Sequence, residues 1–124
     1  MTELSGYSVL VIEDDFYLAD DAQMALEAAG ASVIGPVGNT DDALVLIATT
    51  RPDIALVDVN LGKGASFESA AALRASGIPF LFLTGYDANV IPAEYADAPR
   101  LQKPVDKRSL LTALVTLAHQ SRAN

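Results

Sequence analysis

The chain has 124 residues, of which 51% are hydrophobic and none is cysteine. This length and composition support one packed domain over residues 1–124, exclude extensive disorder and disulfides, and leave little room for a second domain. Sixteen acidic residues against eight basic ones give a formal net charge of −8, which disfavours binding to nucleic acid or anionic lipid.

Signals for the membrane or for secretion are not evident. No apolar run reaches the roughly 18 residues that a membrane-spanning helix requires. Residues 1–7 lack the basic and apolar regions of a signal peptide. We therefore expect a cytoplasmic protein that does not associate with membranes.

Two pairs of strand and helix are predicted in the first half of the chain. The expected strands are residues 7–12 and 31–35, and the second is followed by turn residues 36–39. Asn39 or Thr40 caps the second helix. The apolar residues at helical spacing are Leu18, Ala22, Ala25, Leu26 and Ala29 in the first helix, and Leu44, Ile47 and Ala48 in the second.

A third apolar run, residues 54–57, is typical of a strand that is buried on both faces of a parallel sheet. It ends on Asp58, whose charge is costly to bury without partners. In open α/β sheets, ligands bind in the crevice at the carboxyl ends of the strands, so Asp58 is a candidate site residue. Alone, it is also compatible with an Asp that turns or caps the strand end.

A third helix and a fourth strand are expected next. Ser66 is a plausible cap for this helix and Gly77 ends it. Residues 78–83 form a further apolar strand that ends on Thr84. The apolar residues assigned to the third helix are Phe67, Ala70, Ala71 and Leu73.

The last third of the chain is less regular at its start. Residues 87–98 contain Pro92, are followed directly by Pro99 and show weak periodicity, which predicts a poorly formed helix or a loop. A short strand at 101–102 precedes Lys103, and Asp106 caps the final helix. The apolar residues of that helix are Leu110, Leu111, Leu114, Val115, Leu117 and Ala118. Five alternations of strand and helix predict a parallel sheet covered on both faces.

Polar side chains at four strand ends are expected to converge. They are Glu13 with Asp14, then Asp58, Thr84 and Lys103. Three carboxylates in one crevice require raised pKa values or a bound cation, and oxygen ligands beside a phosphoryl group favour Mg²⁺. With an ammonium and a hydroxyl, such a site can hold the oxygens of a phosphoryl group in transfer to Asp58.

Each of these residues also has an ordinary structural explanation when it is taken alone. The acids from Glu13 to Asp15 suit a solvated helix start, because acids favour helix N-termini. Thr84 fits a strand-end hydroxyl and Lys103 a surface lysine before a turn. The coincidence of all of them at strand ends favours the functional interpretation.

The same residues resemble the receiver domain of the bacterial response-regulator family, along the whole chain. Residues 9–15 resemble the first strand and acidic pair of the family, Asp58 its phospho-acceptor, Thr84 its switch hydroxyl and Lys103-Pro104 its lysine and following cis proline. The resemblance implies a doubly wound, flavodoxin-like α/β fold with strand order 2-1-3-4-5. It also implies that Asp58 accepts a phosphoryl group.

The resemblance further implies a ligand set and partners. Asp14 and Asp58 would hold Mg²⁺ directly with the backbone carbonyl of Asn60, and Glu13 would act mainly through water. The donor would be a sensor histidine kinase or a histidine phosphotransferase, and the output a downstream protein. The chain would be no enzyme beyond self-phosphorylation from small donors and autodephosphorylation.

One position departs from the usual family pattern. Arg100 stands three residues before the lysine, where the family usually has Tyr or Phe. Residues 79–86 instead resemble the FATGUY subgroup, whose members pair with kinases of the HWE or a related type and have an irregular fourth helix. We hypothesise that Gly85 supplies flexibility and that Tyr86, with Thr84, reports phosphorylation; half-buried packing is the alternative role of Tyr86. The candidate switch residues are Thr84, Gly85, Tyr86, Arg100 and Pro104.

The leading interpretation is a single-domain response regulator, which relays a signal or drains phosphate from a kinase. A phosphatase of the haloacid dehalogenase type is the enzymatic alternative, but such enzymes carry a second Asp where this chain has Asn60. A phosphorylation-independent interaction module is the third. Gly62 and Gly64 form no nucleotide-binding fingerprint, and His119 is expected to be an ordinary surface residue.

Overall fold

The computed structural model describes residues 3–60, 67–85 and 91–123. Five parallel strands form one sheet in the order β2-β1-β3-β4-β5, which confirms the predicted fold class and strand order. In chain order the elements are β1 (Ser8–Ile12), α1 (Phe16–Ala28), β2 (Ser32–Val37), α2 (Thr40–Thr50), β3 (Ile54–Asp58), α3 (Glu68–Ala75), β4 (Phe80–Thr84), the 3-10 helix η2 (Ala93–Tyr95), β5 (Arg100–Gln102) and α4 (Lys107–Ala123).

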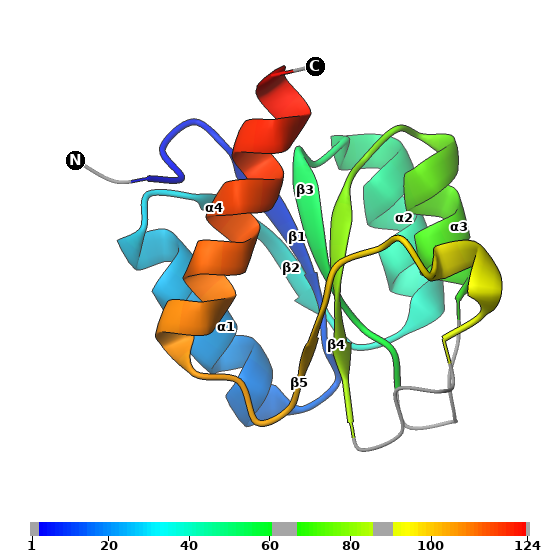
Figure 1. Ribbon diagram of the computed structural model, residues 1–124, viewed down its shortest axis with the longest axis horizontal. Coiled ribbons are helices and arrows are strands. Elements are labelled where there is room, and N and C mark those ends of the chain that lie inside the picture. The colour runs from blue at the N-terminus through cyan, green and yellow to red at the C-terminus, as the bar shows by residue number, and fades with distance from the viewer. Residues whose placement is uncertain (1–2, 61–66, 86–90, 124) are drawn as a thin grey trace.

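Helices cover both faces of the sheet. Figure 1 shows α1 and α4 on one face and α2 and α3 on the other, and each pair is in contact. This arrangement follows from the connections, since parallel neighbours must be joined by crossovers that pass over a face of the sheet. None of the helices in the described ranges is long and apolar enough to cross a membrane.

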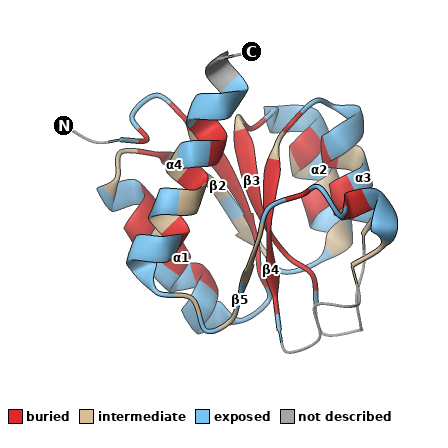
Figure 2. Cartoon of the chain, viewed as in Figure 1, coloured by how far each residue is buried: buried red, intermediate tan, exposed pale blue. Residues whose placement is uncertain are grey.

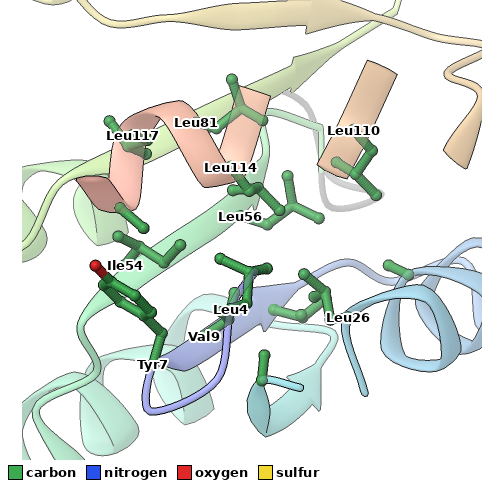
Figure 3. Packing of buried hydrophobic residues seen from close by; sticks show 14 of the residues in the cluster. Leu4, Tyr7, Val9, Leu26, Ile54, Leu56, Leu81, Leu110, Leu114 and Leu117 are labelled. Carbon is green, nitrogen blue, oxygen red and sulfur yellow. The ribbon is translucent and has the colours of Figure 1, made fainter. Parts of the chain in front are cut away.

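Alternate residues of the central strands supply two separate cores. Ile54 and Leu56 of β3 and Leu81 of β4 pack with Leu114 of α4 on one face (Figure 3). The residues between them, such as Val57, pack against α2 and α3 on the other face. Figure 2 shows β3 and β4 buried throughout, as predicted for strands covered on both sides.

The second strand is longer than predicted. It continues through Gly35-Pro36 to Val37, although residues 36–39 were expected to form a turn. The pairing advances from Leu10 opposite Ile34 to Ile12 opposite Val37, so β2 contains one extra residue. This β-bulge lets a segment with Gly and Pro stay in the sheet. Asn39, rather than Thr40, then caps α2 by accepting from the amide of Asp42.

Three residues that helped to define the predicted apolar helix faces are exposed: Leu18, Ala48 and Ala71. The buried positions of α1 are Ala19, Ala22, Ala25 and Leu26, and Leu18 retains 41% of its exposure. The prediction was therefore confirmed for Ala22, Ala25 and Leu26 and wrong for Leu18, whose neighbour Ala19 is buried instead. Positions 18 and 19 lie four and three residues before Ala22, so both border the same helix face, and in this structure the smaller side chain is the buried one.

The segment before β5 is irregular, as predicted for residues 87–98. Of its described part, only Ala93–Tyr95 is helical, and it forms a single 3-10 turn. Residues 86–90 lie outside the described ranges, as does Ser66, the predicted cap of α3. Phe67 occupies the position before α3 and makes no side-chain capping hydrogen bond.

Candidate functional site

Four of the predicted residues meet at the carboxyl edge of the sheet. Glu13 directly follows β1, Asp58 ends β3, Thr84 ends β4 and Lys103 directly follows β5. The residues Glu13, Asp58 and Thr84 are only 4%, 2% and 2% exposed. Polar groups buried to this extent need hydrogen-bond or charge partners, so their contacts define the site.

Lys103 bridges the two buried carboxylates. Its Nζ lies 3.0 Å from Glu13 Oε1 and 3.0 Å from Asp58 Oδ2. A backbone amide binds the second oxygen of each carboxylate: Asn60 N donates to Asp58 Oδ1 at 3.0 Å, and Asp15 N donates to Glu13 Oε2 at 3.2 Å. One ammonium thus faces two carboxylates, which leaves an excess of acidic groups before Asp14 is counted.

The pKa values at the site reflect this crowding. Burial raises the pKa of Glu13 to about 7, and the neighbouring Asp58 acts in the same direction while Lys103 opposes it. Burial lowers the pKa of Lys103, but its hydrogen bonds to Glu13 and Asp58 and their charges outweigh burial, so this pKa is raised. The carboxylates therefore hold Lys103 in its charged form.

The acidic cluster fits a small divalent cation. Glu13, Asp14 and Asp58 each offer a carboxylate oxygen, and these oxygens lie within 4.8 Å of one another. Glu13 Oε1 is buried and lies 3.0 Å from Lys103 Nζ, which also contacts Asp58. Asp14 is exposed, which leaves room for the water that Mg²⁺ retains in proteins. A cluster of hard oxygen donors with access to solvent suits such an ion.

Thr84 is tied to the strand beside it. Its hydroxyl donates to the carbonyl of Leu101 at 3.4 Å, a long hydrogen bond, and its own carbonyl accepts from Lys103 N at 2.7 Å. Since β4 and β5 are paired, the end of β4 and the backbone of Lys103 are linked directly. The strand end that carries Thr84 therefore helps to position the backbone of Lys103, the residue that neutralises Asp58.

The remaining predicted residues are not all near the carboxylates. Asn60 adjoins Asp58, Gly85 is exposed directly after Thr84, and the bond from Lys103 to Pro104 is cis, as the resemblance implied. Tyr86 lies outside the described residues. The guanidinium of Arg100 donates instead to three backbone carbonyls at the end of η2, those of Tyr95, Ala96 and Ala98.

The sequence interpretation overlooked an aromatic cluster beside β4. Tyr95 of η2 is 4% exposed, stacks on Phe67 and meets Phe82 edge to face. The guanidinium of Arg74 lies 5.0 Å from the centroid of Tyr95 and donates to the carbonyl of Glu94. The apolar residues within 87–98 follow neither helical nor strand periodicity, so the sequence contained no signal for a buried Tyr95.

Two residues have ordinary structural roles. Asp15 caps α1 by accepting from the amides of Tyr17 and Leu18. The structural explanation considered for the acids after β1 therefore holds for Asp15. His119 is exposed, with its ring 6.3 Å from that of Tyr7, in agreement with the surface position predicted for it.

Comparison with known sequences identifies relatives of the whole domain. The family model described as the response regulator receiver domain matches residues 9–115. The sensory transduction protein LytT of Bacillus cereus is 29% identical over 119 residues, which are 93% of this chain and 48% of LytT. The phyllosphere-induced regulator PhyR of Methylorubrum extorquens is 29% identical over 89 residues, 69% of this chain and 33% of PhyR. The chain spans about half the length of the curated relatives it matches first.

Solved structures show the same architecture. The solution structure of SdrG from Sphingomonas melonis Fr1 is 33% identical to this chain, with a TM-score of 0.79 over 94% of this chain and 98% of SdrG. The signal receiver domain of a modulated diguanylate cyclase from Desulfovibrio desulfuricans G20 is 29% identical, with a TM-score of 0.78 over 94% and 97% of the two chains. The similarity therefore extends over nearly the full length of both solved domains.

Proposed function

Because the chain belongs to the response regulator receiver domain family, we propose that it accepts a phosphoryl group on Asp58 and then changes which protein it binds. The observation that best supports this is the buried carboxylate of Asp58, held 3.0 Å from the ammonium of Lys103 at the carboxyl edge of the sheet. The proposed donor is a phosphohistidine of a sensor histidine kinase or of a histidine phosphotransferase, the partners of this family.

In the proposed reaction, a carboxylate oxygen of Asp58 forms a bond to phosphorus as the bond from phosphorus to the imidazole nitrogen breaks. The nitrogen keeps the electron pair and takes up a proton, and Asp58 becomes an acyl phosphate. Lys103 Nζ already lies 3.0 Å from this carboxylate, so its ammonium group can contact the phosphoryl oxygens once they are bonded to Asp58. The hydroxyl of Thr84, at the adjacent strand end, is the proposed donor to the same oxygens.

The proposed cofactor is Mg²⁺. Asp14, Asp58 and the backbone carbonyl of Asn60 are the proposed direct ligands, with Glu13 acting mainly through water. When bound, the ion supplies positive charge for the phosphoryl oxygens. The acidic cluster supports this assignment, because within the described residues its three carboxylates face one ammonium, that of Lys103.

For the output, we propose that Thr84, Gly85 and Tyr86 carry the change to the surface near Pro104. The use of Arg100 as a partner of η2 carbonyls supports a switch without the usual aromatic at that position. Membership of the FATGUY subgroup and a kinase of the HWE type are parts of the same proposal. A Gly85→Ala or Tyr86→Phe variant that is phosphorylated and still signals normally counts against it.

The experiment that tests the proposed function is intact mass after incubation with Mg²⁺ and acetyl phosphate, for the wild type and Asp58→Asn. Gain of one phosphoryl group by the wild type alone is the expected result. Rapid donor hydrolysis without a stable adduct favours the phosphatase alternative. Absence of both reactions, even with phosphorylated histidine phosphotransferases as donors, leaves a binding module that acts without phosphorylation.

The proposal also includes a location and a limit on activity. The proposed protein is a single-domain regulator in the cytoplasm, with no enzymatic turnover beyond its own phosphorylation and dephosphorylation. Whether it relays a signal or drains a kinase is decided by transfer kinetics with the cognate kinase. A relay retains its phosphoryl group long enough to bind its partner, whereas a phosphate sink loses it faster than the partner binds.

A further inference from the structure

The end of β2 lies against the backbone of the acidic pair. The amide of Glu13 donates to the carbonyl of Val37 at 2.9 Å, one residue beyond the last paired position of β1. This contact depends on the extra residue in β2, since the pairing changes register between Leu10 and Ile12. Because of the bulge, the hydrogen bonds between β1 and β2 continue one residue past the end of β1, to Glu13 at the site.

Gly38 makes the next contact. A Cβ atom added to Gly38 would lie 3.3 Å from Asp14 Cα, 3.6 Å from Asp14 Cβ and 3.8 Å from the carbonyl oxygen of Glu13. The first distance is shorter than carbon atoms normally approach one another in packed proteins. Gly38 does not have a positive φ, so the reason for glycine here is the close approach to Asp14 and not backbone strain.

The carboxylate of Asp14 has little else to hold it. In the described ranges, no residue hydrogen-bonds to this exposed side chain. Glu13 and Asp58, by contrast, are held by Lys103 and by amides. The position of the Asp14 carboxylate is therefore determined by the Asp14 backbone, which is in close contact with Gly38.

We propose that Val37 and Gly38 are positioning residues for the cation site, which act through the backbone of Glu13 and Asp14. The hydrogen bond from the Glu13 amide to the Val37 carbonyl fixes where the backbone of the acidic pair leaves the edge of the sheet. The close contact with Gly38 fixes the position of the Asp14 backbone beside it. This inference rests on the proposed Mg²⁺ site and adds two residues to it that offer no ligand atom of their own.

The test compares Mg²⁺ affinity, measured by titration calorimetry, in the wild type, Gly38→Ala and Gly77→Ala. Gly38→Ala is expected to weaken Mg²⁺ binding roughly threefold to tenfold. This is less than the about 10- to 100-fold loss typical when a residue that hydrogen-bonds to a metal ligand is removed. Gly77 is the matched control. Its φ of +72° makes Ala unfavourable there, but nothing lies within 4 Å of the added Cβ. Gly77→Ala should lower the melting temperature and leave Mg²⁺ affinity unchanged.

A double-mutant cycle separates positioning from general damage. If Gly38 acts through Asp14, Gly38→Ala should change Mg²⁺ affinity little in an Asp14→Asn background. Equal losses in both backgrounds overturn the inference, as does wild-type affinity in Gly38→Ala. If the wild type itself binds no Mg²⁺ at millimolar concentrations, the proposed metal site fails first, and the inference fails with it.

Hydrogen exchange in metal-free protein supplies a readout that needs neither Mg²⁺ nor phosphorylation. The Glu13 amide should be protected in the wild type and should exchange faster in Gly38→Ala. The Ala55 amide, which donates to the carbonyl of Pro79, should keep its rate. An unprotected Glu13 amide in the wild type, or equal acceleration of both amides, contradicts the proposed backbone positioning.

Discussion

Lys103 Nζ lies 3.0 Å from Asp58 Oδ2 and at the same distance from Glu13 Oε1, so a single cation compensates two buried carboxylates from different strands. The stability of the fold and the chemistry of the site therefore depend on the same ammonium. Its removal leaves these acidic groups buried without a counter-charge from the described part of the chain, which is more costly than the loss of an exposed ion pair.

Lys103→Gln is expected to lower the free energy of unfolding by about 1 to 3 kcal/mol at pH 8 without metal. This is less than the roughly 3 to 5 kcal/mol of a fully buried pair, because the Lys103 side chain is 26% exposed. Urea unfolding followed by circular dichroism measures the loss. Lys107→Gln, at an exposed position on α4, is the control and should stay within about 0.5 kcal/mol of the wild type. Equal stabilities of the two variants would contradict the assigned role.

The raised pKa of Glu13 predicts a pH dependence of stability in metal-free protein. The pKa is about 7 in the folded state against 4.5 as the ordinary value, so between these pH values the folded state retains a proton that the unfolded state has lost. Stability therefore falls as pH rises from about 4.5 to 7 and levels off above it, by up to about 3 kcal/mol from this group.

Glu13→Gln cannot titrate at this position, so the measurement is the difference in unfolding free energy between this variant and the wild type, with EDTA, from pH 5 to 8. The variant is expected to gain stability relative to the wild type as pH rises. A difference that does not vary with pH, or that changes in the opposite direction, shows that Glu13 is already ionised at pH 5.

Mg²⁺ should stabilise the folded chain, because the acidic cluster exists only after folding brings the ends of β1 and β3 together. At ten times the dissociation constant, the expected gain is about 1.4 kcal/mol, with a melting temperature that rises with Mg²⁺ concentration. Thermal unfolding with and without EDTA measures it. Asp14→Asn should lose most of the gain, whereas Asp41→Asn, at an exposed position on α2, should keep it. The same gain in both variants would place the ion elsewhere.

Arg74 links α3 to the 3-10 helix η2 by two kinds of contact. Its guanidinium packs 5.0 Å from the ring centroid of Tyr95 and 5.5 Å from that of Phe80, and it donates to the carbonyl of Glu94 at 2.8 Å. The ion pair with Asp97 is exposed on both sides, with side chains 43% and 76% exposed. The ring and carbonyl contacts should therefore contribute more than the ion pair.

Arg74→Ala is accordingly expected to lower the free energy of unfolding by about 1 to 2 kcal/mol, and Asp97→Asn by less than about 0.5 kcal/mol. Chemical denaturation measures both. If the Asp97 variant loses as much as the Arg74 variant, the ion pair and not the ring packing holds η2 against α3.

Much of this protein followed from local sequence patterns. The apolar runs at residues 7–12, 54–57 and 78–83 predicted strands because residues buried on both faces of a sheet must be apolar throughout. Their alternation with helical spacing then restricted the topology to a parallel sheet. Since the carboxyl ends of parallel strands share one edge, the convergence of Asp58, Thr84 and Lys103 was also predictable.

Other features depend on contacts between residues that are distant in the chain, which no local pattern encodes. At the start of α1, burial of Ala19 and exposure of Leu18 depend on how the helix packs against the rest of the fold. The burial of Tyr95 required Phe67 and Phe82 around it. The sequence alone was therefore sufficient for the elements, their order and the residues at the strand ends. Only the tertiary structure decided that one ammonium is shared by two carboxylates and that Gly38 lies against Asp14, because such contacts depend on packing to within a few tenths of an ångström.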